Sequence, residues 1–154
     1  MKAIKKILVP LDFSDCSKHA FYYALDIVAK EKAELFLLHI IDLDLLDNIS
    51  SLKLCSKAKA IKLMERYAKT EFNKLRKESV KKAALSVKEI IENGIPFVKI
   101  LNKAMDLNID LIVMGSFGAS SPIHRLFFGS TTEKVLKGAN TPILCVPLPR
   151  AIEG

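Results

Sequence analysis

The sequence predicts an α/β fold, built on a doubly wound parallel sheet in a single domain. Short apolar runs alternate five times with segments of helical periodicity, and each run is continuously apolar. Continuous apolar runs are typical of parallel strands that helices cover on both faces. A chain of 154 residues has about the length of one domain, so we expect one domain over residues 1–154.

The first three elements follow from two apolar runs and a helix cap. The run 7–10 predicts a buried strand that ends at Pro10. Ser14 is a typical N-cap for the next helix, whose apolar residues recur at three- and four-residue spacing over 20–28. The apolar run 35–41 predicts the second strand.

The middle of the chain predicts a loop, a long helix and a third strand. Residues 42–51 are acidic and contain Asn and Ser, which favours a loop. Apolar residues recur with helical spacing over 52–79, while lysines fill the other faces. The segment 83–91 predicts a strand, and Pro96, at the end of the turn 93–96, suits the first turn of another helix.

Two strands and one helix complete the pattern. The apolar run 111–114 predicts a strand that ends at Gly115. Ser130 to Glu133 is a Ser-x-x-Glu capping box, so we expect a helix that starts at Ser130 and ends at Gly138. The apolar run 143–146 predicts the fifth strand.

The composition argues against several classes of protein. Half of the residues are hydrophobic, which excludes a mainly disordered chain. No apolar run is long enough for a transmembrane helix, and the basic N-terminus lacks the pattern of a signal peptide. The three cysteines, Cys16, Cys55 and Cys145, are too far apart for a disulfide framework or a metal pair. We therefore expect a cytoplasmic protein.

The formal charge of +7 comes from the middle of the chain, where 53–103 holds 14 basic and five acidic residues. A basic block can bind nucleic acid or an anionic membrane. This one is dominated by lysine and lacks interleaved aromatic residues, so we interpret it as a solvated helix face. We expect no membrane partner and do not favour nucleic acid.

Asp12 and several glycines stand where the predicted strands end or where the last predicted helix begins. Leu11 and Asp12 follow the first strand, Gly115 and Gly118 follow the fourth, and Gly129 precedes the last helix. Ligands of open α/β sheets bind at these strand ends. Glycine lets backbone N–H groups approach an anion, and a helix N-terminus supplies unpaired donors, so the pattern predicts a phosphate site. The alternative is that the glycines only turn the chain and the serine after the last one only caps a helix.

Five segments of the sequence carry a family resemblance: 7–14, 38–40, 94–96, 114–118 and 129–130. Through them the chain resembles the universal stress protein family over essentially its whole length. The ATP-binding branch of that family carries G-x2-G-x9-G-[ST], and this chain departs from the motif by having ten residues in the second spacer. We expect the extra residue in 119–122, at a loop tip, where insertions are tolerated.

The resemblance implies a Rossmann-like, five-stranded parallel sheet of order 3-2-1-4-5, an ATP ligand with or without Mg²⁺, and a role in the stress response. It also implies a homodimer through the last strand, Ile143–Val146. The residues that it assigns to the nucleotide are Pro10, Leu11, Asp12, Ile40, Met114, Gly115, Gly118, Gly129, Ser130, Thr131 and Thr132.

Three functions remain open at this point. The leading one is a nucleotide-binding regulatory protein with no catalytic residue. Phe117, where several family members carry a polar or charged residue, and the longer spacer keep a nucleotide-free interaction module as an alternative. The third is a slow ATP hydrolase. His39 is expected to be a hydrogen-bonded core residue, whereas His124 and Arg125 could reach a bound anion or lie on the surface.

Overall fold

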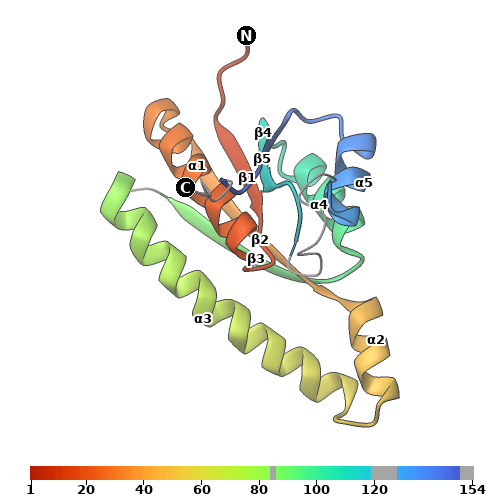
Figure 1. Ribbon diagram of the computed structural model, residues 1–154. Helices are drawn as coiled ribbons and strands as arrows, with labels where there is room; N and C mark the ends of the chain where they lie inside the picture. Colours follow the sequence, from red (N-terminus) through yellow and green to blue (C-terminus); the bar gives the residue numbers. More distant parts are fainter. Residues whose placement is uncertain (84–85, 119–127, 150–154) are drawn as a thin grey trace, which may run out of the picture.

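Five parallel strands form one sheet in the order β3-β2-β1-β4-β5 (Figure 1), as the sequence predicts. The computed structural model describes residues 1–83, 86–118 and 128–149. The strands are β1 (Lys6–Pro10), β2 (Glu34–Asp42), β3 (Val87–Gly94), β4 (Leu111–Gly115) and β5 (Ile143–Val146).

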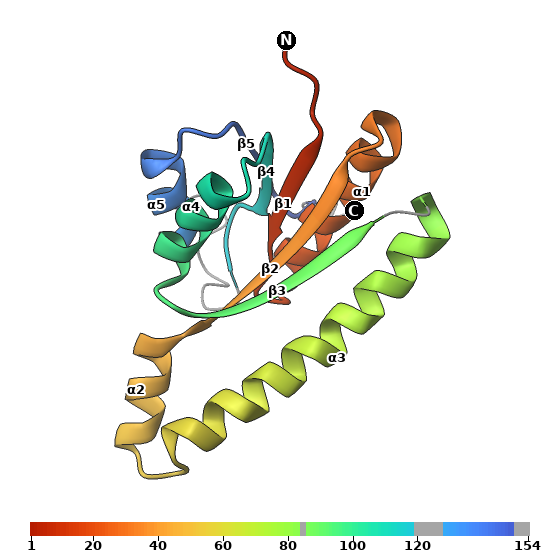
Figure 2. The ribbon, with the colours of Figure 1, turned by 180° about the vertical axis from the view of Figure 1, so that it is seen from behind.

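Helices cover both faces of this sheet, with α1 and α3 on one face and α4 and α5 on the other (Figures 1 and 2). The helices are α1 (Asp15–Glu31), α2 (Leu43–Ser51), α3 (Lys57–Ala83), α4 (Pro96–Asp106) and α5 (Ser130–Gly138). Successive side chains of a strand point to opposite faces. In β1, Ile7 and Val9 therefore join the core under α1 and α3, while Leu8 joins the core under α4 and α5.

The strand order creates a switch point between β1 and β4. β1 is the central strand, with Ile7 in register with Leu35 of β2 on one side and with Leu111 of β4 on the other. The chain leaves β1 toward one edge and leaves β4 toward the other. Connections that diverge in this way open a crevice at the carboxyl ends of the two strands.

Asp110 ties the N-terminal segment to the start of β4. Its carboxylate forms an ion pair with Lys2 (2.8 Å) and accepts hydrogen bonds from the backbone amides of Lys5 (2.9 Å) and Lys6 (3.0 Å). The Lys2 ammonium and these amides favour the charged form, so the pKa of Asp110 lies below its usual value. This anchor lies at the amino end of the sheet, away from the crevice.

Residues 42–51, predicted as a loop, instead form α2. The Asp42 side chain caps this helix by accepting hydrogen bonds from the amides of Asp44 (3.0 Å) and Leu45 (3.3 Å). An acidic cap satisfies otherwise unpaired amides and suits the positive end of the helix dipole. Leu46, only 1% exposed, anchors the helix. The acidic residues that suggested a loop therefore belong to a capped first turn.

α3 also departs from its predicted limits, because it begins at Lys57 and continues to Ala83. Its C-terminal half packs on the sheet through Phe72 and Leu75, whereas its N-terminal half extends past the carboxyl edge of the sheet together with α2 (Figure 2). We call α2 and residues 57–67 of α3 the helical arm. None of the helices in the described ranges has the length and apolar character needed to cross a membrane.

Candidate functional site

A cleft of about 800 Å³ opens at the carboxyl edge of the sheet. All eleven residues that the resemblance assigns to the nucleotide line it. They are Pro10, Leu11 and Asp12 from β1 and its end, Ile40 from β2, Met114, Gly115 and Gly118 from β4 and the turn after it, and Gly129, Ser130, Thr131 and Thr132 from the start of α5. The volume lies in the range of small-molecule and cofactor sites.

Asp12 occupies the mouth of β1. It lies at the surface, and it accepts a hydrogen bond from the Ser14 amide (3.0 Å) and another from the Ser14 hydroxyl. Ser14 in turn caps α1 by accepting from the Ser17 amide. Asp12 thus supports the cap of α1 and presents a carboxylate to the cleft at the same time.

Gly115 allows α1 and β4 to approach each other closely. A Cβ atom at this position would lie 2.9 Å from Cys16 Sγ and 3.0 Å from the Cys16 carbonyl carbon. Cys16 is 1% exposed, and its sulfur lies 3.5 Å from the Val146 carbonyl oxygen. Gly115 is therefore required by packing, and Cys16 is a buried packing residue.

The two halves of the glycine motif contact each other. The Gly129 amide donates to the Ser116 carbonyl (2.9 Å), and a Cβ atom at Gly129 would lie 3.1 Å from the Cα atom of Phe117. A Cβ atom at Gly118 would lie 2.6 Å from Asp12 Oδ2. The ten-residue spacer thus still brings Gly118 and Gly129 to one place. Its extra residue, expected in 119–122, lies outside the described residues, as do His124 and Arg125.

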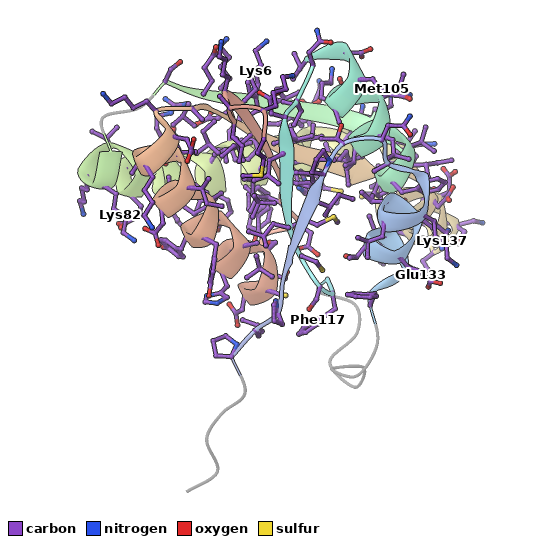
Figure 3. The ribbon with its side chains drawn as sticks, turned by 90° about the horizontal axis from the view of Figure 1, so that it is seen from above. Lys6, Lys82, Met105, Phe117, Glu133 and Lys137 are labelled. Atoms are coloured by element: carbon purple, nitrogen blue, oxygen red, sulfur yellow. The ribbon has the colours of Figure 1, made fainter. Side chains whose placement is uncertain are left out.

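The predicted capping box at the start of α5 is wrong. Gly129 is the N-cap, with φ −59° and ψ 156°, and no side chain in the described chain caps the helix. Glu133 forms an ion pair with Lys137 (2.7 Å) on the outer side of α5 (Figure 3), and the amide of the N-cap Gly129 donates to the Ser116 carbonyl instead. Because Ser130 is already the first residue of α5, the Ser-x-x-Glu pattern stands one position too late to form a capping box.

The start of α5 therefore keeps backbone donors that no side chain of the described residues uses. The first turn of a helix carries unpaired N–H groups and a partial positive charge. Ser130 and Thr131 add hydroxyl groups that line the cleft. The Thr132 hydroxyl is already engaged, since it donates to the Gly115 carbonyl (2.9 Å) and ties α5 to the end of β4. This end of the cleft can hold an anionic group through neutral donors.

His39 is a buried core residue, as predicted, although it also lines the cleft. It is 8% exposed, and its Nδ1 lies 2.7 Å from the Leu11 carbonyl oxygen. Because a carbonyl only accepts, Nδ1 carries the proton that makes this bond. Burial lowers the pKa of His39, while the Leu11 bond and the charge of Asp12 oppose that change. The folded state therefore favours the neutral imidazole.

The cleft has a polar end, and apolar side chains lie elsewhere in its lining. The polar end is formed by the turn after β4 and the start of α5, while the apolar side chains Ile40, Ile100 and Met114 lie among the remaining lining residues. The charged lining residues in the described chain are Asp12 and Asp42. No group of three or more His, Cys, Asp or Glu residues that could hold a metal ion occurs within the described ranges. The arrangement suits a ligand with an apolar ring and an anionic group held by hydrogen bonds.

The comparison with known families decides the class of this chain. Residues 3–147 match the model of the universal stress protein family.

This chain belongs to the universal stress protein family.

Individual relatives agree with the family assignment. This universal stress protein is 34% identical to universal stress protein MJ0577 of Methanocaldococcus jannaschii, over 92% of the chain and 94% of that protein. The solved MJ0577 structure superposes with a TM-score of 0.84, covering 97% of this chain and all of that one. Universal stress protein UspA from Lactobacillus plantarum superposes with a TM-score of 0.82 and 29% identity, covering 95% of this chain and 99% of that one.

Two more distant structures share the fold and were solved with nucleotides. A universal stress protein in complex with cAMP is 22% identical and superposes with a TM-score of 0.65, covering 95% of this chain and 98% of that one. The universal stress protein from Archaeoglobus fulgidus in complex with dAMP is 18% identical, with a TM-score of 0.62 and coverage of 94% and 99%. At these identities the likeness concerns the fold.

Several lining residues of this universal stress protein escaped the sequence analysis. They are Ser17, Asp42, Leu45, Met64, Tyr67, Pro96, Ile100 and Phe128. Asp42 ends β2 and is the N-cap of α2, and Leu45 lies in α2. The recurrence of Leu43, Leu46 and Ile49 after this acidic N-cap was the signal that could have revealed the helix. Met64 and Tyr67 lie on α3, where nothing in the local pattern indicates which residues reach the cleft.

Two glycines of the motif should respond differently to alanine. We expect Gly115→Ala to lower the free energy of unfolding by about 1–3 kcal/mol, because the new Cβ meets backbone atoms of Cys16. Gly118→Ala should cost less than about 1 kcal/mol, since its close contact is the end of the Asp12 side chain, which can rotate. Urea unfolding of both variants checks this order, and an equal or larger loss in Gly118→Ala contradicts it.

His39 should make stability depend on pH below neutrality. The unfolded chain binds a proton on histidine near pH 6.5, whereas the folded chain resists it because its pKa is lowered. Stability from this residue is therefore complete above about pH 6.5 and is lost as the pH falls through that value toward the folded pKa. His39→Asn, whose amide can still donate to Leu11, should lose less stability between pH 7.5 and 5.5 than the wild type. If urea unfolding shows the same change in the free energy of unfolding with pH in both proteins, the prediction is contradicted.

Proposed function

We propose that this universal stress protein is a cytoplasmic regulatory protein that binds an adenine nucleotide, ATP in the first place, in the cleft at the carboxyl edge of the sheet. The observation that carries the proposal is the contact between Gly129 and Ser116 beside the start of α5, where no side chain of the described residues caps the helix. This contact brings the two glycine segments together around backbone and hydroxyl donors, which is the chemistry that phosphate oxygens require.

The rest of the cleft supports the same ligand. Its apolar lining, with Ile40, Ile100 and Met114, suits an adenine ring. Two relatives of the same fold were solved with cAMP and with dAMP, both of which are adenine nucleotides. The described lining offers no cationic side chain to neutralise a triphosphate, so we expect Mg²⁺ to accompany ATP and to bind mainly through the phosphate oxygens.

Titration of the purified protein with nucleotides tests the proposal. Mg-ATP, ADP, AMP and cAMP are added in turn to protein freed of bound ligand, and the heat of binding or the melting temperature of the protein is measured. Native mass spectrometry of protein purified without added nucleotide provides an independent readout. We expect saturable binding and a co-purified adenine nucleotide. No binding and no rise in melting temperature at millimolar Mg-ATP would leave the nucleotide-free interaction module as the function.

Phe117 and Phe128 are the observation that favours this second candidate. Both line the cleft beside the glycines, and Phe128 is 53% exposed, so the polar end has apolar neighbours that a peptide side chain could cover. Turnover of ATP at a steady rate would instead support slow hydrolysis.

We also propose a homodimer formed through β5. This four-residue strand pairs with β4, and its other edge meets no strand within the described residues. Unpaired strand edges are templates for pairing with another chain. Light scattering after size-exclusion chromatography tests the dimer, and a monomeric mass at micromolar concentration contradicts it.

A further inference from the structure

Three of the cleft-lining side chains come from the helical arm rather than from the sheet. Leu45 belongs to α2, and Met64 and Tyr67 belong to α3. The helical arm extends beyond the carboxyl edge of the sheet (Figure 2), so its side chains can line the cleft beyond the ends of the strands. All three side chains are apolar or aromatic, unlike the glycines and hydroxyls around the start of α5.

Tyr67 is exposed but held in place. It is 54% exposed, and its ring meets the ring of Phe13 edge-on, at 5.7 Å between centroids and 87° between planes. Phe13 is buried and packs against His39 (4.7 Å) and Phe72 (5.5 Å). The buried ring of Phe13 and the aromatic rings around it thus fix the position of Tyr67, while much of the Tyr67 surface stays available to a ligand.

The backbone of Phe13 links this cluster to the strand end. Phe13 has φ +64°, a left-handed conformation that is rare for a bulky residue. Such a conformation persists where the surroundings over-determine it, and here the buried aromatic contacts do so. It directs the Phe13 ring toward α3 while the neighbouring Asp12 lines the cleft.

We propose that Tyr67 is the residue that recognises the base, by stacking on the ring of a bound nucleotide, with Leu45 and Met64 as its apolar flanks. This inference rests on the proposed nucleotide function and adds the residue that selects an aromatic ring. Aromatic side chains and bases stack favourably without a hydrogen-bond code, and a methionine sulfur adds favourable contact with a ring. The helical arm is then part of the binding site.

The test separates the base from the phosphates. Tyr67→Ala, Tyr67→Phe and the control Tyr23→Ala are titrated with Mg-ATP, with adenosine and with inorganic tripolyphosphate. Tyr23 is a matched control because it is 50% exposed on α1 and does not line the cleft. We expect Tyr67→Ala to weaken the binding of ATP and of adenosine by about tenfold and to leave the affinity for tripolyphosphate unchanged. Tyr67→Phe and Tyr23→Ala should keep the wild-type affinities.

A spectroscopic readout needs no substitution at Tyr67. The chain has no tryptophan and three tyrosines, so Tyr22→Phe with Tyr23→Phe leaves Tyr67 as the only fluorescent side chain of this kind. We expect adenosine to quench its emission with the same midpoint as binding, and tripolyphosphate not to quench it. This fluorescence measurement remains decisive if Tyr67→Ala fails to fold.

The outcomes distinguish the two proposals. A wild-type protein that binds neither ATP nor adenosine overturns the nucleotide function itself. A wild-type protein that binds ATP, together with unchanged affinity in Tyr67→Ala or unquenched Tyr67 emission, overturns the stacking role and leaves the nucleotide function standing.

Discussion

Gly129→Asp should abolish the stabilisation of this protein by Mg-ATP. Gly129 is the N-cap of α5 and has the extended backbone that an aspartate cap adopts. The new carboxylate would accept hydrogen bonds from the first amides of α5, which we expect to bind phosphate, and it would also repel the phosphates. A ligand at 100 times its dissociation constant stabilises a protein by about 2.7 kcal/mol, or roughly 5–11 °C for a chain of this size. Thermal unfolding with and without Mg-ATP should show that shift only in the wild type.

Gly138→Asp is the matched control. It introduces the same charge at the other end of the same helix, about 13 Å along its axis. The close neighbour of a Cβ atom there is Leu101 Cδ1 at 2.9 Å, the end of a side chain that can move. We expect the ligand-induced shift to survive in this variant. Gly129→Asn brings the same close contact with the Phe117 backbone and can cap α5 without a charge, so it should keep part of the shift. A full shift in Gly129→Asp would mean that the phosphates do not lie at α5.

Phe72→Ala should cause the largest loss of stability, about 3–5 kcal/mol. Phe72 is 0% exposed on α3 and packs edge-on against Phe13. Removing its ring leaves a cavity under the helix that carries the arm, and part of the apolar burial that holds α3 on the sheet disappears. Because whole domains are stable by only about 5–15 kcal/mol, this loss is a large share of the total.

The control for Phe72→Ala lies on the same helix. Leu63 is 51% exposed, so Leu63→Ala should change the free energy of unfolding by no more than about 0.5 kcal/mol. Urea unfolding of both variants gives the comparison. Equal losses would show that α3 is not anchored through Phe72.

The fold could be predicted from the sequence because its strands are short, fully apolar and separated by helical periods. Residues such as Leu8 and Val9 are buried on opposite faces, which produces the continuous apolar run that indicates a covered sheet. The predicted site residues also come together, since parallel strands end at one edge. Asp12 and Gly118, more than 100 positions apart in the chain, meet there for this reason.

Local ambiguity explains two of the incorrect assignments, the loop at 42–51 and the capping box at the start of α5. Residues 42–51 contain acidic and polar residues that occur equally in loops and in capped first turns, and burial of Leu46 decides for the helix. At the start of α5 the N-cap is Gly129, one residue before the serine of the Ser-x-x-Glu pattern, and Glu133 pairs with Lys137. In both cases the local pattern fits more than one arrangement, and the folded chain selects one.

The sequence by itself determined the sheet, its order through the family resemblance, and the strand-end residues of the cleft, because these depend on hydrophobic pattern and on motif spacing. Only the tertiary structure decided which helix residues complete the cleft. Tyr67 reaches it because Phe72 anchors α3 on the sheet and Phe13, in a left-handed conformation, meets its ring from the end of β1. Contacts between segments more than 50 residues apart depend on packing geometry, which no local pattern of residue types encodes.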